Sequence, residues 1–331
     1  MADIAARIGV SRQLVSLVLR DEPGASEVTR ARVRRAAEEL GYRPHVAARS
    51  LRQRRSRHLG VAFVPGHPSV PGVVEGIYAE AAARGYQVLL SAVTRTRSTR
   101  LAVDELLGHR CAALVVVGSE LSDIQMKAVV RRANVPVAWV GTGRRQTAFD
   151  VVLSGGAEGI AMAVAHLVTL GHRDLTYVHC ESMPQARPRL DGYLRAMAEV
   201  GGDPDVLEVR SRDHTEESGA KAGRRLLRRG TLPTGVVCGN DQQAVGLLGV
   251  LSRAGVRVPA DVSLTGFGDS RFASVSSVDL TTVREHQEEL GATAVDAVLR
   301  RVDRASARPG LHVVHPALVV RGSTDEPRDD R

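Results

Sequence analysis

Five side chains near the amino terminus share one face of a short helical segment. They are spaced i, i+1, i+4, i+5 and i+8 along the chain: Arg12, Gln13, Ser16, Leu17 and Arg20. Arginine and glutamine can form paired hydrogen bonds with base edges in the DNA major groove, whereas leucine offers only apolar contact, for example to a thymine methyl. The pattern therefore predicts a helix that reads bases.

Two short amphipathic helices joined by a tight turn would position this face. Apolar residues recur at helical spacing on one side of each: Ile4, Ala5 and Ile8 in the first, and Val15, Val18 and Leu19 in the second. Gly9 can adopt a positive φ in the turn, and Ser11 is a good N-cap for the second helix. This is the plan of a helix-turn-helix. Because amphipathic helix pairs are common, the prediction needs support from the neighbouring residues 26–57.

A third helix and a basic segment supply that support. Ser26 is an N-cap type, Thr29 and Arg30 are placed to contact phosphate, and Gly41 ends the helix. After Pro44 the chain is basic and helical in pattern as far as residue 57. Residues 1–57 hold 13 arginines, no lysine and 6 acidic residues, a balance of +7 within the net +8 of the chain. Basicity confined to one small segment indicates a nucleic-acid partner.

From about His58 onward, apolar strands alternate with helices. Strands are expected at 59–64, 88–93, 112–117, 135–140, 175–179, 235–238 and 262–267, and helices at 73–84, 101–107, 124–133, 159–170, 190–200, 219–229 and 244–254. Continuous apolar strands in such an alternation predict buried parallel sheets with right-handed crossovers. The pattern alone fits either one large sheet or two lobes.

Several motifs closely resemble the LacI/GalR family of bacterial transcription regulators. They are DIAARIGVS at 3–11, VSLVL at 15–19, ASEVTR at 25–30, GYRP at 41–44, ARSL at 48–51 and PALVVRGST at 316–324. The resemblance implies an all-α helix-turn-helix headpiece followed by an α/β, two-lobed, type I periplasmic-binding-protein-like effector domain with parallel doubly wound sheets. Crossover strands between the lobes are then expected at 151–155, 281–284 and 313–316.

The same resemblance implies a domain plan and a way of binding DNA. The headpiece covers 1–43, a hinge helix 44–57, the effector and dimerisation domain 58–325, and a loose tail 326–331. Phosphate contacts fall on Ser11, Ser26, Thr29, Tyr42 and Arg49. Leu51 takes the place of a leucine that wedges into the minor groove at the centre of a palindrome. The expected partners are double-stranded operator DNA and a second copy of the chain.

The resemblance also places a carbohydrate-like effector between the lobes. Six residues are candidates for contacting it: Arg189, Asn240, Asp241, Asp269, His67 and Ser69. The first four are near expected strand ends, where ligands bind in α/β folds. Arg189 could equally be a surface arginine, Asn240 and Asp241 a helix cap, and Asp269 a turn residue. His67 and Ser69 are the weakest candidates, because they stand in a segment unlike that of relatives.

Four positions differ from the pattern of relatives. Gly268 replaces an acid common in sugar-binding members, and Gly155-Gly156 replaces an Asp-Asn pair, so two acceptors of charge-assisted hydrogen bonds are missing. With Arg189 retained, an anionic effector such as a sugar acid is one hypothesis, and a cleft without a ligand is the other. Leu17 stands where many relatives have an arginine, which predicts a different preferred base there.

Two other protein classes fit less well. An enzyme lacks support, because the glycine-rich stretch at 141–146 has no third glycine and no catalytic or metal-ligand motif appears. A secreted solute-binding protein would need an export signal and no basic headpiece. The three cysteines are widely spaced and indicate buried, reduced thiols. We therefore expect no cofactor, no metal and no membrane span, and a cytoplasmic location.

Overall fold

The computed structural model describes all residues except 20, 43–55, 67–68, 119–121, 142–147, 183–184, 211–214 and 329–331. The chain forms two compact units, Met1–Ser56 and Arg57–Arg331. Each is described by itself. None of the described helices is long and apolar enough to cross a membrane.

Three helices make up the described part of the first unit: α1 (Ala2–Ile8), α2 (Arg12–Leu19) and α3 (Glu27–Glu39). Gly9 ends α1 in the left-handed conformation, with φ of 68°. The Ser11 hydroxyl accepts a hydrogen bond from the Leu14 amide, and the Ser26 hydroxyl caps α3 in the same way through Thr29. The predicted helix pair, turn and caps are confirmed. A small core holds the helices together: Ile4, Ala5, Val15, Val18, Val33, Ala36 and Ala37.

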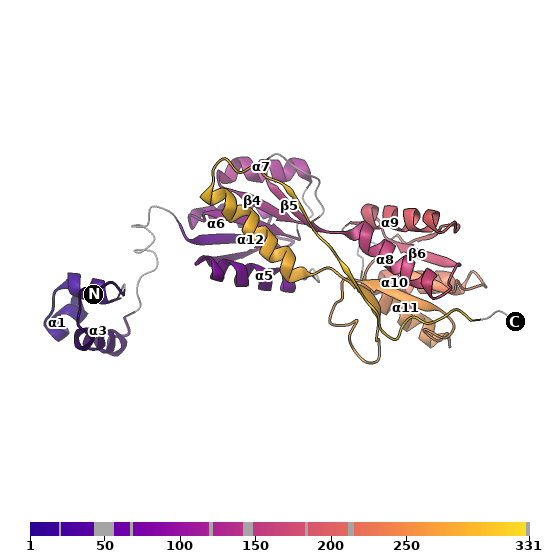
Figure 1. Cartoon of the computed structure of the whole chain (residues 1–331), viewed down its shortest axis with the longest axis horizontal. Coiled ribbons are helices and arrows are strands. Elements are labelled where there is room, and N and C mark those ends of the chain that lie inside the picture. The colour runs from indigo at the N-terminus through magenta and orange to yellow at the C-terminus, as the bar shows by residue number, and fades with distance from the viewer. Residues whose placement is uncertain are drawn as a thin grey trace. The chain divides into compact units, whose positions relative to one another are not determined.

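The second unit contains two six-stranded sheets, each forming the centre of one lobe (Figure 1). The first sheet has the order β11-β5-β4-β3-β1-β2, with parallel neighbours throughout. Its strands are β1 (His58–Phe63), β2 (Gln87–Ala92), β3 (Ala113–Val117), β4 (Val137–Val140), β5 (Asp150–Ser154) and β11 (Leu311–Val314). One face packs on α5 (Val70–Ala83) and α12 (Gln287–Asp303), and the other on α6 (Thr99–Gly108) and α7 (Asp123–Ala133).

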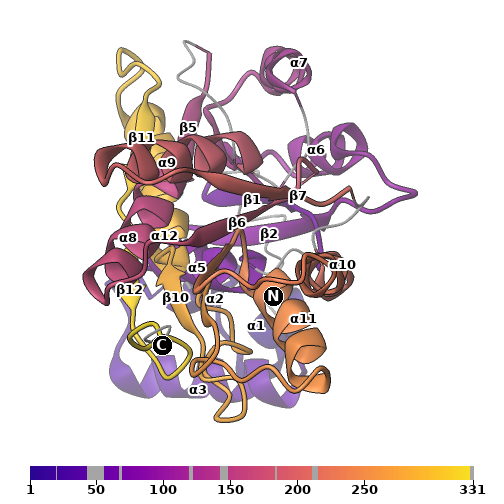
Figure 2. The same ribbon diagram turned by 90° about the vertical axis from the view of Figure 1, so that its right-hand side faces the viewer.

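The second sheet has the order β12-β10-β9-β8-β6-β7. Its strands are β6 (Leu175–His179), β7 (Asp205–Glu208), β8 (Gly235–Cys238), β9 (Ser263–Phe267), β10 (Thr281–Arg284) and β12 (Ala317–Val319). Helices α8 (Gly156–Thr169) and α9 (Ala186–Glu199) cover one face, and α10 (Glu216–Leu227) and α11 (Asp241–Arg253) the other (Figure 2). The pair β10–β12 is antiparallel, so the predicted parallel pairing fails at this strand.

Three segments connect the lobes, as the family resemblance implied. The chain passes from β5 in the first sheet to α8, from β10 in the second sheet to α12, and from β11 back to β12 (Figure 1). Within the described residues, the turns after β5 and β10 therefore belong to the hinge between the lobes.

All three cysteines are buried without forming disulfides, as expected. Burial raises the pKa of the Cys111 thiol to about 11.

Two elements of the structure, α12 and β7, are not among those expected from the sequence pattern. Helix α12 buries Leu290, Ala294 and Val298 at helical spacing, so its signal is present in the sequence. Strand β7 has four residues, and both of its ends are acidic. A short edge strand without a continuous apolar run gives no clear signal.

Candidate nucleic-acid interface and effector site

Arg12 and Gln13 form the free part of the predicted recognition face. Both side chains are exposed at the start of α2. Neither makes a hydrogen bond or ion pair with any residue that the structure describes. Ser16 and Leu17, one turn further along, are half-buried. Arg20 lies outside the described residues.

The other described headpiece arginines hold the unit together. The Arg30 guanidinium donates to the carbonyls of Ala25 and Glu22 and pairs with Asp21, which fixes the loop between α2 and α3. Its side chain is only 10% exposed, so the expectation that it contacts phosphate is wrong. Four more arginines bond to residues of the same unit: Arg7, Arg32, Arg34 and Arg35.

The remaining headpiece candidates differ in accessibility. Leu17 packs against the headpiece core, and a Cβ added at Gly24 would be 3.3 Å from its methyl group. Tyr42 also packs on this core. The hydroxyls of Ser26 and Thr29 lie 2.9 Å apart and hydrogen-bond to each other near the start of α3. Arg49, Leu51 and the rest of the expected hinge helix lie outside the described residues.

Arg189 on α9 is buried, with 6% of the residue exposed. Its Nη1 donates to the Gly239 carbonyl at 2.6 Å, and its Nη2 to Glu285 Oε1 at 3.1 Å. The guanidinium carbon lies 3.7 Å from the centre of the Phe267 ring. The strand ends of β8 and β9 and the hinge after β10 therefore fix this side chain, which is not a surface arginine.

Glycines allow α9 to approach close enough to place Arg189. A Cβ at Gly192 would lie 2.4 Å from the Ala157 carbonyl oxygen in α8. A Cβ at Gly156 would lie 2.5 Å from the side-chain oxygen of Gln185 and 3.3 Å from Arg189 Cγ. The atoms near Gly192 are backbone atoms that cannot rotate away, so this position requires glycine for packing, whereas a side chain at Gly156 would first have to displace the side chains of Gln185 and Arg189. Gly156 thus lies against the side chains at the start of α9, in addition to lacking an acid.

Glu285 is a candidate site residue that the sequence analysis does not identify. It follows β10 at the point where the chain enters the hinge. Its Oε1 accepts hydrogen bonds from Arg189 and, at 2.6 Å, from the Ser154 hydroxyl at the end of β5. An acid directly after an expected crossover strand is the signal that would have found it.

Asn240 and Asp241 have different roles. The Asn240 side chain caps α11 by accepting from the Gln243 amide at 2.8 Å, which confirms the cap alternative for this residue. Asp241 is 2% exposed and accepts from the Thr282 hydroxyl at 2.5 Å and the Ser270 amide at 2.6 Å. Burial raises the pKa of its carboxyl, although these two hydrogen bonds act in the opposite direction.

Asp269 directly precedes Ser270 in the turn after β9, and its backbone has a positive φ of 45°. Its carboxylate pairs with Arg284 at 2.7 Å and with Arg321 at 2.7 Å. Burial alone would raise the pKa of Asp269, but hydrogen bonds from the two arginines hold it below its ordinary value. Both carboxylate oxygens of Asp269 therefore already form ion pairs with arginines of the chain.

Gln287, at the start of α12, connects this region to the first lobe. Its Nε2 donates to the Gly268 carbonyl at 3.3 Å, and a Cβ at Gly72 in α5 would lie 2.6 Å from its Oε1. Ser69 directly precedes α5 and does not cap it with its side chain.

Taken together, these contacts place four of the six predicted effector residues at one end of the second sheet: Arg189, Asn240, Asp241 and Asp269. His67 lies outside the described residues.

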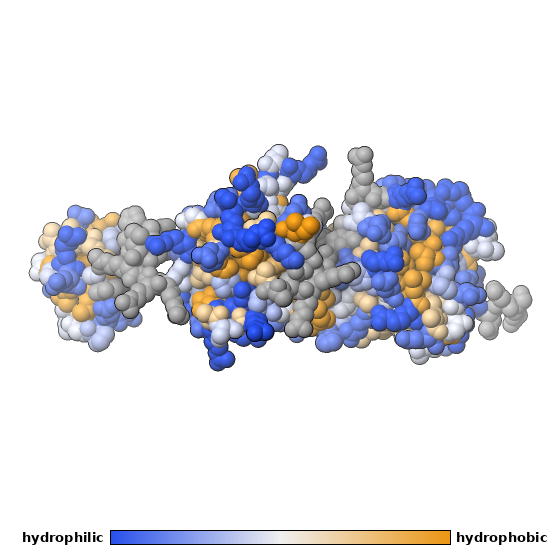
Figure 3. Space-filling model, turned by 90° about the horizontal axis from the view of Figure 1, so that it is seen from above, coloured by the Kyte–Doolittle hydropathy of each residue, from blue (hydrophilic) through white to orange (hydrophobic). Residues whose placement is uncertain are grey.

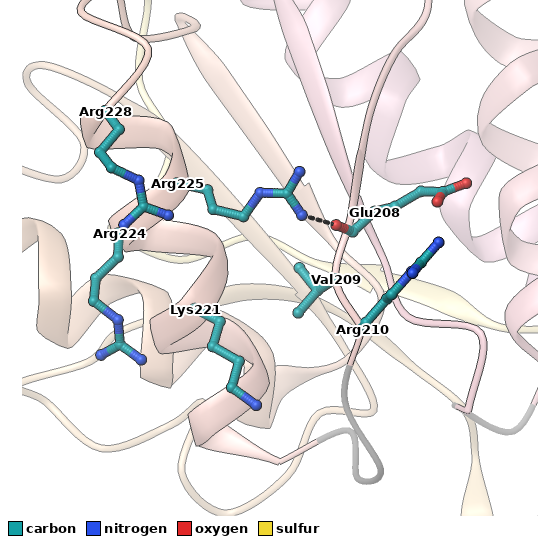
Figure 4. A pocket seen from close by; sticks show the side chains of 7 residues that line it. All are labelled: Glu208, Val209, Arg210, Lys221, Arg224, Arg225 and Arg228. Atoms are coloured by element: carbon teal, nitrogen blue, oxygen red, sulfur yellow. Dashed lines mark hydrogen bonds between the residues drawn. The ribbon is translucent and has the colours of Figure 1, made fainter.

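A basic groove of about 440 Å³ lies elsewhere, at the outer edge of the second lobe (Figure 4). The residues lining it are Glu208, Val209, Arg210, Lys221, Arg224, Arg225 and Arg228. Arg225 donates to the backbone carbonyl of Glu208 in the edge strand β7. Charged side chains over an edge strand are a common protection against pairing with other chains, so we interpret the groove as edge protection.

Comparisons with known proteins agree with the two units. A family described as "Bacterial regulatory proteins, lacI family" matches residues 1–45, and a "Periplasmic binding protein-like domain" matches residues 164–324. The transcriptional regulator GalR of Salmonella typhimurium is 33% identical, over 99% of this chain and 96% of GalR. The chain belongs to the LacI family. The transcriptional repressor PurR of Proteus mirabilis is 31% identical, over 97% of this chain and 95% of PurR.

Solved structures of LacI-family proteins share the fold. The Lac repressor dimer bound to operator and the anti-inducer ONPF aligns with a TM-score of 0.84 and 28% identity, over 98% of each chain. A LacI transcriptional regulator from a Rhodococcus species aligns with a TM-score of 0.75 and 34% identity, over 82% of this chain and 99% of the other. The predicted family and fold class are confirmed. This LacI-family chain is a DNA-binding transcriptional regulator and not an enzyme.

Proposed function

We propose that this LacI-family protein is a repressor that binds a palindromic operator as a homodimer. Arg12 and Gln13 carry the proposal, because they are exposed at the start of α2 and have no described partner within the chain. The first residues of a recognition helix are those that reach base edges in this motif. Side chains already bonded within the headpiece, such as Arg30, are not available for this contact.

Backbone contacts would come from the residues around α2 and α3. Ser11, Ser26, Thr29 and Tyr42, together with Arg49, are proposed to position the headpiece on phosphates. Ser26 and Thr29 hydroxyls flank the exposed start of α3, whose amides favour an anion. Leu51 is proposed to enter the minor groove between two half-sites. These assignments rest on the family motif at 48–51 and on the position of the capped α3.

A homodimer is supported by surface chemistry. Large apolar side chains are exposed on both lobes, among them Tyr78 at 44% on α5, Leu90 at 42% on the edge strand β2, and Phe272 at 40% and Val275 at 44% after β9. Figure 3 shows hydrophobic residues reaching the surface of both lobes. Exposed apolar area favours association between chains. The Lac repressor structure that aligns here is a dimer bound to operator.

The effector is proposed to bind at the end of the second sheet, where Arg189, Asn240, Asp241 and Asp269 gather, and near Ser69. A small carbohydrate or sugar acid fits a site rich in hydrogen-bonding groups. One aligned structure is a regulator in complex with cellobiose, at 27% identity. Control of DNA binding then requires that the effector bind one lobe arrangement more tightly than the other, by an amount equal to the coupling free energy.

Selection of duplexes from a random pool by the full-length protein tests this function. We expect an inverted repeat, and Arg12→Ala should weaken binding to it by about 1–3 kcal/mol, or roughly 5–150-fold. Arg35→Ala is the matched control, because it removes the same charge from an exposed arginine on α3 that pairs with Glu39. The proposal fails if no inverted repeat is enriched, or if both variants bind the enriched site equally well.

A further inference from the structure

The cationic group of the effector site already has an anion supplied by the chain. Arg189 donates to Glu285 across 3.1 Å, and the exposed fractions of the two side chains are only 7% and 13%. The Gly239 carbonyl and the Phe267 ring hold the guanidinium from two further directions. The charge of Arg189 is therefore balanced before any ligand arrives.

Glu285 is itself held in place at one oxygen only. Its Oε1 accepts from both Ser154 and Arg189. Among the described residues, no group donates to Oε2. A carboxylate oxygen in this position can accept a hydrogen bond from a ligand hydroxyl, and hydrogen bonds to ionised groups are stronger than neutral ones.

An anionic ligand meets an obstacle at this pair. To reach the guanidinium it must either displace Glu285, which exchanges one charge-assisted pair for another, or lie beside a partly buried carboxylate of the same sign. Neither route gains from the charge of Arg189. A neutral, hydroxyl-rich ligand meets no such repulsion, because it can donate to the carboxylate and accept from polar groups around it.

We propose that Glu285 is a built-in counter-ion for Arg189 that makes the effector site select neutral, hydroxyl-rich ligands and exclude carboxylates. This inference rests on the proposed function, since it concerns the ligand of the same site. It assigns a specificity-determining role to a hinge residue. It also chooses between the sugar and the sugar acid that the sequence leaves open.

Acetate is the probe for the first test, in the full-length protein. Glu285→Ala removes the counter-ion and leaves space for a small carboxylate beside Arg189. Acetate at about ten times its dissociation constant should raise the melting temperature of this variant by about 3 °C relative to sodium chloride at equal ionic strength. In the wild type the Glu285 side chain already pairs with Arg189, so acetate should not change the melting temperature relative to sodium chloride.

Three variants control the acetate experiment. Glu158→Ala removes a carboxylate from α8 that pairs with exposed His315, and should not create an acetate response. Adding Arg189→Gln to Glu285→Ala should abolish the response. Adding Lys221→Gln and Arg228→Gln should leave it intact, which excludes binding in the basic groove. The proposal is overturned if the wild type responds like Glu285→Ala, or if the response survives the loss of Arg189.

Matched pairs of neutral sugars and their acids form the second test. Galactose with galacturonate and glucose with glucuronate are titrated against the wild type and the conservative variant Glu285→Gln, which keeps the shape of the side chain. The affinity for the acid relative to the neutral sugar should rise at least about tenfold in the variant. Tighter binding of an acid than of its neutral partner by the wild type would contradict the proposal.

The two tests separate this inference from the proposed function. The acetate response is measured without DNA, so it decides the role of Glu285 even if neither sugar pair binds. Operator selection is measured without added effector, so a failure there refutes the repressor function and leaves the counter-ion result standing.

Discussion

The close approach of α8 and α9 gives a stability prediction whose sign can be worked out at Gly192. A Cβ added there would lie 2.4 Å from the Ala157 carbonyl oxygen and 2.7 Å from Ala157 Cα, which are backbone atoms. The helices would have to separate by roughly 1 Å to restore normal contact. Overpacking of this kind costs about 1–3 kcal/mol, and the gain in helix propensity from glycine to alanine offsets up to about 1 kcal/mol.

Because backbone atoms cannot rotate away, the upper part of that range applies, and Gly192→Ala should lose about 2 kcal/mol. For a unit of this size the melting temperature should fall by about 4–8 °C. Gly249→Ala in α11 is the matched control, because its Cβ would meet only the Arg253 guanidinium, at 3.7 Å. That variant gains helix propensity and should melt about 1–4 °C higher than the wild type.

Thermal unfolding followed by far-ultraviolet circular dichroism compares the three proteins under identical conditions. The reasoning requires opposite signs for the two glycine variants, since both positions lie inside helices and differ mainly in what the new methyl meets. If both variants shift the melting temperature in the same direction, close helix contact does not explain the glycine at 192.

Two further predictions concern the start of β5 in the first sheet and the DNA face. Asp150 is 1% exposed; burial alone would raise its pKa, but hydrogen bonds from His312, the Gly310 amide and Arg301 hold the pKa below its ordinary value. A carboxyl whose pKa is lower in the folded than in the unfolded state stabilises the fold at pH values above its unfolded pKa, and this contribution is lost as the pH falls below about 4. Asp150→Asn should therefore lower the free energy of unfolding, measured in urea, by about 1–3 kcal/mol at pH 7 and by progressively less below about pH 4. A difference in unfolding free energy between the variant and the wild type that does not change with pH would contradict this. Leu17→Arg should move the selected operator toward guanine at one position of each half-site, and an unchanged selected sequence would refute a base contact at residue 17.

Local structure in the headpiece could be predicted well from the sequence. Gly9, Ser11 and Ser26 act through hydrogen bonds and backbone angles within a few residues, so their types and spacing are sufficient. The same holds for strands such as β6 and β8, whose expected bounds match the structure because both are continuous apolar runs between clear breaks. Where side chains act over a long sequence distance, prediction fails.

Arg30 and Glu285 show why. Both are charged residues at the end of a recognisable pattern, and each owes its role to partners that the pattern does not contain. Arg30 is buried because the loop before α3 folds its carbonyls around the guanidinium. Glu285 pairs with a residue 96 positions earlier in the chain. Periodicity describes which face is buried, but not which polar group a distant segment places opposite it.

Two carboxylates at the end of the second sheet, Asp269 and Glu285, are paired with arginines of the chain, and this constrains how an effector can act. Asp269 is engaged by two arginines, and Glu285 links Arg189 to Ser154 across two hinge segments. Breaking a buried ion pair is costly unless the ligand replaces the lost partner. An effector that leaves these pairs intact must therefore act through weaker contacts between the lobes, such as the one from Gln287 to the Gly268 carbonyl. One neutral hydrogen bond contributes about 1 kcal/mol, which lies within the range of typical coupling free energies between sites. The ionic pairs thus fix the hinge, and the neutral interlobe contacts remain as the part that a neutral ligand can shift.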